Sequence, residues 1–188
     1  LNENQLRVLY NRAKFLRESG CPLGGLRQVR MLILGNATTS LIPRSLIGSA
    51  LRHSIYLEIF ESGYNQIEQV ALGDTSQFSE QNFDFIFLSF EPGSLGLMTE
   101  IGDISAAEDK IKETLQYFKA IVSKLRERFG SEVILQNLVP LPDRFLGSLD
   151  SRLAGTPAWF IGKINDHLPD YLSEQCLIFD AAHLAAVV

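Results

Sequence analysis

The sequence predicts an α/β fold in which a five-stranded parallel sheet is covered by helices on both faces. Short apolar segments alternate five times with segments of helical periodicity, which is the pattern of repeated strand–helix units. Residues 83–90 are apolar except for Asp84 and Ser89, as expected of a strand buried on both faces. With 188 residues, 46% of them hydrophobic, the chain is long and apolar enough to form one domain with its own core.

The first elements follow from apolar spacing and turn residues. Residues 4–18 are a predicted helix, because apolar residues recur on one face, at Leu6, Leu9, Tyr10, Ala13 and Leu16. Gly20 and Pro22 end this helix, and Gly63 marks a later turn. Pro43 is tolerated in the first turn of a helix. We therefore expect strands at 29–34 and 55–60 and helices at 41–53 and 64–72.

The helix after the third strand has the clearest local signal in the sequence. Ser105 and Glu108 have the spacing of a capping box, in which each side chain binds a free amide at the helix start. Gly130 is placed to end the helix in a left-handed conformation. Between them, apolar residues recur at helical spacing, at Ile111, Leu115, Phe118, Ile121, Val122 and Leu125.

The last third repeats the alternation. A strand at 132–136 is followed by a long loop, and Pro157 opens a helix that reaches residue 172. A fifth strand at 175–179 precedes a last helix that has neither a capping glycine nor a polar tail. We expect right-handed crossovers throughout and a domain excised from a longer protein.

Composition narrows the classes of function. Seventeen Lys and Arg against 22 Asp and Glu give a net charge of −5 without a basic run, which argues against nucleic acid and anionic lipid as partners. No apolar run reaches the ~18 residues of a membrane span, and no signal peptide is recognisable. Cys21 and Cys176 are expected to be unpaired thiols, and no His or Cys pair has zinc-ligand spacing. We therefore expect a cytoplasmic protein with no metal and no cofactor.

Candidate site residues follow from the topology of parallel sheets, whose ligand crevice lies beyond the carboxyl ends of the strands. The polar residues that follow the predicted strands are the candidates. Those expected to bind substrate are Gly35, Asn36, Thr39, Asn65 and Asn137. Residues 35–39 could also cradle an anion at a helix start. That segment has one glycine and no following Lys, so a simple strand-to-helix turn is favoured.

Asp180 and His183 are the candidate catalytic pair. At this spacing a carboxylate can hold an imidazole in one tautomer, and the imidazole can then act as a base on a hydroxyl. Thr38 is the tentative nucleophile, with Thr39 and Ser40 as alternatives. The plainer interpretation stays open and is favoured on spacing alone: Asp180 caps the last helix and His183 has no special role.

Three stretches are similar to the N-terminal domain of the FkbH-like proteins, with support from residues 64–69. They are residues 31–43 (MLILGNATTSLIP), 133–140 (VILQNLVP) and 177–185 (LIFDAAHLA). The resemblance implies a flavodoxin-like three-layer α/β/α fold at 25–188, related to the SGNH hydrolases, after an N-terminal helix and linker at 1–24. It also implies a C-terminal phosphatase-like domain of the haloacid dehalogenase class (subfamily IIIC) in the same parent chain. The parent protein would load a glyceryl unit onto an acyl carrier protein, as in polyketide biosynthesis.

The chain departs from the SGNH hydrolases at their nucleophile. Their first block is Gly-Asp-Ser, whereas this chain has Ala37 in place of the serine, and Phe90-Glu91-Pro92 lacks their third-block Asn. Only the final Asp-x-x-His is retained, at Asp180 and His183. We therefore expect a degenerate accessory domain that positions an acyl carrier protein or a small acyl substrate. The alternatives are an active esterase or acyltransferase with a displaced Thr nucleophile, and a structural or dimerising domain without a ligand.

Overall fold

Five parallel strands form one sheet in the order β2-β1-β3-β4-β5. The computed structural model describes residues 3–20, 24–37, 39, 42–73, 77–142 and 144–187. The strands are β1 (Arg27–Gly35), β2 (Ile55–Glu61), β3 (Phe85–Ser89), β4 (Glu132–Gln136) and β5 (Leu177–Phe179). The predicted α/β class is confirmed. In this order the chain reverses its direction of winding between β1 and β3, as in flavodoxin-like folds.

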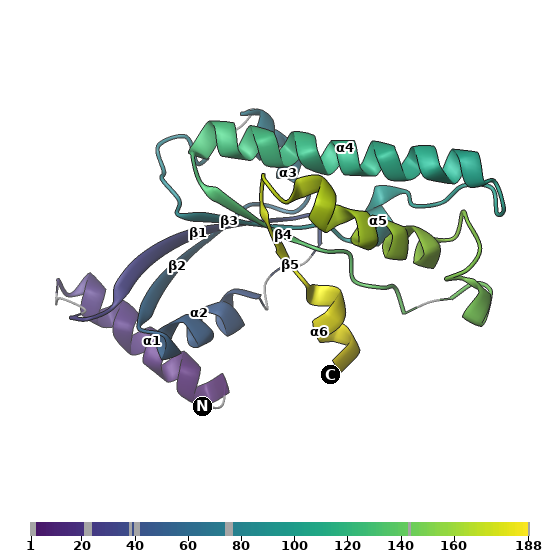
Figure 1. The fold of residues 1–188 in the computed structure, drawn as a ribbon. Coiled ribbons are helices and arrows are strands. Elements are labelled where there is room, and N and C mark those ends of the chain that lie inside the picture. The colour runs from purple at the N-terminus through teal and green to yellow at the C-terminus, as the bar shows by residue number, and fades with distance from the viewer. Residues whose placement is uncertain are drawn as a thin grey trace.

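Helices cover both faces of the sheet (Figure 1). One face carries α3 (Ile67–Leu72), α4 (Ile104–Phe129) and α5 (Pro157–Leu172), and the other carries α1 (Glu3–Glu18), α2 (Ile42–Arg52) and α6 (Ala181–Val187). Two short 3₁₀ helices, η1 (Pro92–Leu95) and η2 (Gly147–Leu149), lie in the loops after β3 and β4. The arrangement is consistent with three layers.

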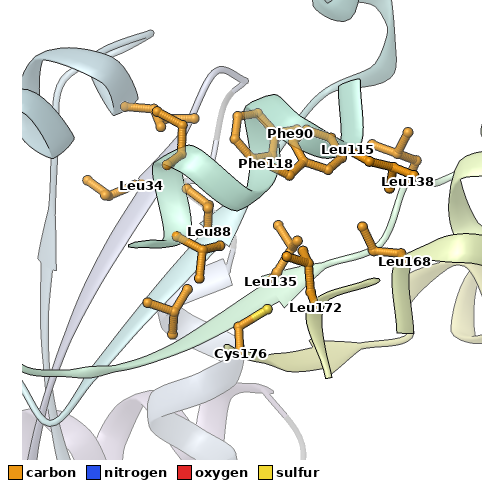
Figure 2. Packing of buried hydrophobic residues seen from close by; sticks show 14 of the residues in the cluster. Leu34, Leu88, Phe90, Leu115, Phe118, Leu135, Leu138, Leu168, Leu172 and Cys176 are labelled. Carbon is orange, nitrogen blue, oxygen red and sulfur yellow. The ribbon is translucent and has the colours of Figure 1, made fainter. Parts of the chain in front are cut away.

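The main hydrophobic core lies between the sheet and the α3–α5 layer. Figure 2 shows strand residues such as Leu88 and Leu135 gathered with Phe118 of α4 and Leu172 of α5. Alternate residues of β1 face opposite ways, so that Leu32 and Leu34 join this core. A smaller cluster on the other face is formed by Val29, Met31, Ile33, Ile47, Leu57 and Phe87. The sheet is therefore apolar on both faces, as the composition of its third strand predicts.

The predicted capping box of the long helix is wrong. The N-cap of α4 is Asp103, whose side chain accepts a hydrogen bond from the Ala106 amide at 3.0 Å. Asp and Ser are equally good N-cap residues. Ile104 and Ser105 already have helical backbone, so the N-cap is Asp103 and not Ser105. The predicted end is confirmed: Gly130 has φ +64° and its amide donates to Arg126 O.

Several predicted elements are shorter than expected; the strand predicted at 83–90, for example, spans Phe85–Ser89. Two of the differences have a clear local cause. The helix predicted from residue 64 begins at Ile67, because Asn65 has a left-handed backbone with φ +54°. The strand predicted from residue 175 begins at Leu177, because the amides of Gln175 and Cys176 bind Leu172 O and close the end of α5. Both differences are caused by local turns, which the spacing of apolar side chains does not predict.

In the described residues, none of the helices combines the length and apolar character that crossing a membrane requires. The same part of the chain holds no group of three His, Cys, Asp or Glu side chains placed to bind a metal ion.

Candidate functional site

The carboxyl ends of β1 and β3 are joined by Asn36. This buried side chain donates from Nδ2 to Ser94 Oγ at 2.5 Å and accepts the Glu91 amide on Oδ1 at 2.6 Å. Ser94 Oγ in turn donates to Glu91 O at 2.8 Å. The Asn36 amide thus fixes the loop after β3 against the end of β1, at the point where ligands bind in sheets of this topology.

A polar pocket of about 370 Å³ lies beside this junction, and we call it the switch-point pocket. Its wall comes from the ends of β1 and β3, from the start of α3 and from one face of α4. The residues that line it are Asn36, Asn65, Glu68, Ser94, Leu95, Lys110, Glu113, Thr114 and Tyr117. Its volume is within the range of sites for small organic molecules.

Each charged side chain of the switch-point pocket has a partner in the pocket itself. Lys110 Nζ lies 3.0 Å from Glu113 Oε2, and the Tyr117 hydroxyl donates to Glu68 Oε1 at 3.0 Å. Burial, with the Glu68 hydrogen bond and charge, raises the pKa of Tyr117 well above its usual range. The Tyr117 phenol is therefore neutral and acts as a hydrogen-bond donor at physiological pH.

The segment after β1 carries the candidate nucleophiles. Thr39 Oγ1 donates to Glu61 Oε1 at the end of β2, at 2.9 Å. A Cβ on Gly35 would lie 2.7 Å from Thr39 Cγ2, so the close approach of Thr39 requires glycine at position 35. The tentative nucleophile Thr38 and its alternative Ser40 lie outside the described residues.

Asn137, Asp180 and His183 form a second polar group, at the ends of β4 and β5. Asn137 Nδ2 donates to Asp180 Oδ1 at 2.7 Å, and Asn137 Oδ1 accepts the Ala182 amide at 2.9 Å. Asp180 Oδ1 also accepts the His183 backbone amide at 3.0 Å, so Asp180 caps α6. These bonds, from the His183 amide first and from Asn137 second, lower the pKa of Asp180, while the His183 side chain is exposed.

The predicted residues therefore fall into two groups. Asn36 and Asn65 share the switch-point pocket, and Gly35 and Thr39 lie beside it at the ends of β1 and β2. Asn137, Asp180 and His183 lie beyond, because β3 separates β1 from β4.

The contribution of α4 to the pocket does not follow from the strand ends. Lys110, Glu113, Thr114 and Tyr117 follow the spacing i, i+3, i+4, i+7, which places them on one face of a helix. The polar stripe on this helix, which lies beside the apolar face used to predict it, is the sequence pattern that indicates these residues.

The hydroxyl hydrogens of these groups are already donated within the protein. Thr39 donates to the Glu61 carboxylate, Tyr117 donates to the Glu68 carboxylate, and Ser94 and Thr114 donate to the carbonyls of Glu91 and Lys110. In the described part of the chain no hydroxyl is hydrogen-bonded to the His183 imidazole. A hydroxyl nucleophile needs a base within about 2.6–3.2 Å. Among the Ser and Thr hydroxyls named above, only that of Thr39 has a carboxylate, that of Glu61, at this distance. Apart from this pair, the arrangement is suited to binding a polar group.

Solved structures that share this fold include the following two. One is the N-terminal part of protein BF1531 from Bacteroides fragilis, which contains a phosphatase domain complexed with Mg; the TM-score is 0.71, with 17% identity over 94% of this chain and 46% of that chain. The other is BT4096, a gut microbial diltiazem-metabolizing enzyme, with a TM-score of 0.56 and 14% identity over 86% of this chain and 38% of that chain. The chain thus spans less than half the length of either protein, and at these identities the likeness shows the fold alone.

Among curated proteins, none matches the sequence at a significant level. The family model described as "FkbH, N-terminal domain" matches residues 30–187. This range includes the carboxyl ends of all five strands and leaves out α1 and the first residues of β1. The chain therefore belongs to the FkbH N-terminal domain family.

Proposed function

We propose that this chain is a non-hydrolytic, SGNH-hydrolase-like accessory domain. It positions an acyl substrate, or the acyl carrier protein that bears it, for glyceryl or acyl transfer by a phosphatase-like domain of the same parent chain. The observation that carries the proposal is the hydrogen-bond pattern at the rim of the sheet. The pocket offers polar partners such as Asn65 and Lys110. By contrast, the hydroxyls at this rim, those of Thr39, Ser94, Thr114 and Tyr117, already donate to carbonyl or carboxylate oxygens.

The substitution at the SGNH nucleophile position supports this role. Ala37 stands where those hydrolases have serine, and a methyl group cannot attack an ester. Asn36, the residue before it, uses both ends of its amide to hold the loop after β3. The end of β1 therefore contributes to the shape of the pocket, and the reacting groups are supplied by the neighbouring domain.

Two assays test the proposal. Hydrolysis of p-nitrophenyl acetate by the chain should equal that of His183→Ala, because no acyl-enzyme forms. In the parent protein, Asn65→Leu and Lys110→Met should reduce transfer to the carrier protein by about tenfold, the effect of losing one hydrogen bond to a bound group. Hydrolysis of a small phosphate ester by the phosphatase-like domain should not change.

The control and the contrary results are specific. Lys163→Met removes an exposed Lys of α5 outside the switch-point pocket and should leave transfer unchanged. Ester turnover that disappears with His183 would sink the accessory role. Unchanged transfer in both pocket variants would leave the structural or dimerising alternative.

A second candidate, an esterase with a displaced nucleophile, is favoured by one contact. Thr39 Oγ1 lies 2.9 Å from Glu61 Oε1, and a carboxylate at that distance can accept the proton of an attacking hydroxyl. Here Glu61, and not His183, would be the base. Ester turnover that is lost in both Thr39→Val and Glu61→Gln, but retained in His183→Ala, would select this mechanism.

A further inference from the structure

The charge of the chain is divided unevenly along the sequence. The first 53 residues hold eight Lys and Arg and two Glu, a formal charge of +6, whereas the remaining 135 residues carry −11. The positive segment contains α1, β1 and α2, and α1 and α2 lie together on one face of the sheet (Figure 1). The α1 and α2 segments alone hold six Lys and Arg against two Glu, so two neighbouring helices of an acidic chain are basic. Charge asymmetry of this kind is a sign of an anionic partner.

We infer that the groove between α1 and α2 binds an organic anion with an apolar body, such as a carboxylate or a phosphate monoester. The site is separate from the switch-point pocket and shares no lining residue with it. Helix α1 also precedes the residues that the FkbH family model matches, so membership of the family does not account for the groove.

Close packing of the two helices defines the groove. A Cβ on Gly48 of α2 would lie 2.8 Å from both Cβ and Cδ1 of Leu6, so α1 rests directly on the α2 backbone there. A hollow of about 510 Å³ lies beside this contact, with Leu6, Pro43 and Ile47 among its apolar lining. This volume is suited to a small organic molecule and exceeds what a simple inorganic anion would fill.

The charged residues that line the groove are both arginines, and among the described residues neither has a partner. Arg7 comes from α1 and Arg52 from α2, and among the described residues no Asp or Glu lines the groove. Neither guanidinium has a hydrogen bond or ion pair in the described part of the chain. By contrast, Arg30 is paired with Glu58, and Lys110 with Glu113.

The chemistry of the lining selects the ligand. A guanidinium presents a planar fork of donors that matches the oxygens of a carboxylate or a phosphate, and two of them from different helices can bind one head group. The Tyr10 and Ser45 hydroxyls add neutral donors, while Ile47 and Leu6 offer apolar contact to the rest of the ligand. Head and body are therefore recognised by different parts of the groove.

Binding of octanoate and octyl phosphate to the 188-residue chain tests the inference by calorimetry and by amide shift perturbation. Both probes should saturate and perturb amides of α1 and α2, whereas inorganic phosphate and neutral octanamide should bind about tenfold more weakly or not at all. If octyl phosphate alone binds, the head group is a phosphate, and if both bind, the site accepts anions in general.

The variants are chosen so that loss of folding does not mimic loss of binding. Arg7→Gln and Arg52→Gln should each weaken binding about tenfold, while Arg152→Gln, an exposed arginine outside the groove, should not. Ser45→Trp keeps both charges but fills the groove, and it should also reduce binding. Circular dichroism of each variant should match that of the parent chain.

Three results would overturn the inference. Octanamide could match octanoate, Arg152→Gln could weaken binding as much as the groove variants do, or shift perturbations could fall outside α1 and α2. A glutamate-rich peptide that displaces octyl phosphate at lower concentration would also overturn it, because it would assign the groove to an acidic protein partner.

Discussion

The two faces of the sheet are built differently although they share the same strands. Among the described residues, 28 buried residues form the cluster beneath α3, α4 and α5, against six in the cluster beneath α1 and α2. Helix α6, on the second face, has no buried residue in its described part. Burial of apolar area is the main source of stability. The first face therefore holds the fold together, and the second face can leave a groove with unpaired arginines open to solvent.

The largest effect is expected from truncation in the larger cluster. Phe118 of α4 is 1% exposed and stacks on Phe90 with ring centroids 4.6 Å apart. Phe118→Ala removes these contacts and leaves a cavity, and should lower the free energy of unfolding by about 3–5 kcal/mol. Urea denaturation monitored by circular dichroism measures this difference.

The matched substitution on the second face is Ile47→Ala. Ile47 is 8% exposed and belongs to the smaller cluster. The cost should be close to the lower end for such substitutions, about 2 kcal/mol, since the groove beside it lets the site relax. An Ile47→Ala cost equal to that of Phe118→Ala would contradict the difference between the two faces.

A smaller effect is expected where polar contacts hold α6. Asn137→Ala removes the hydrogen bonds to Asp180 and to the Ala182 amide. Loss of a buried hydrogen-bonding group costs about 1–3 kcal/mol. Hydrogen exchange should show reduced protection of the α6 amides, while the amides of α4 stay protected.

Asn165→Ala is the control for this prediction. Asn165 also makes two hydrogen bonds, to the amide and the carbonyl of Leu138, but it lies in α5. Its loss should destabilise the protein by a similar amount without affecting α6 selectively. Equal loss of α6 protection in both variants would show that α6 is not held by Asn137.

The elements of this fold could be predicted from the sequence because their signals are local. The period of the apolar residues locates α4 and α5, and Gly130 and Pro157 locate two of their ends. The start of α4 could not be resolved, since Asp103 and Ser105 are both good caps and only tertiary packing chooses between them.

The candidate site was less predictable because it depends on strand order. All the polar candidates follow strands, but Asn36 and Asn137 follow β1 and β4, which are not neighbours. Each Asn therefore binds a different loop, and the set divides into two groups. No local pattern specifies that β3 lies between them. The groove of α1 and α2 needs the same information, since Arg7 and Arg52 are 45 residues apart.

Two glycines sharpen the comparison between the faces. A Cβ on Gly48 of α2 would meet Leu6 at 2.8 Å, whereas a Cβ on Gly162 of α5 would meet nothing within 4 Å. Gly162→Ala should raise the free energy of unfolding by up to about 1 kcal/mol, because alanine favours the helix. Gly48→Ala has the same propensity gain but pushes α1 away, and should be destabilising by about 1 kcal/mol.

Hydrogen exchange separates the two effects of Gly48→Ala. The amides of α1 should lose protection, and those of β1 and β3 should not. Stabilisation by Gly48→Ala equal to that by Gly162→Ala would show that α1 does not rest closely on α2.

The smallest effect is the pH dependence of the α6 cap. The His183 amide first and Asn137 second lower the pKa of Asp180, so ionised Asp180 favours the folded state above the ordinary aspartate pKa of about 3.9. This contribution is lost as the pH falls through the lower pKa of the folded state.

The chemical shift of the His183 amide measures this titration. Because α6 has no described side chain buried beneath it, the cap is its main attachment, and the His183 amide shift should follow the titration of Asp180. In Asn137→Ala the midpoint should move up toward the ordinary value, and in Asp180→Asn the titration should disappear. A midpoint unchanged by Asn137→Ala would mean that the His183 amide alone sets the pKa, and that the link from β4 does not hold α6 in place.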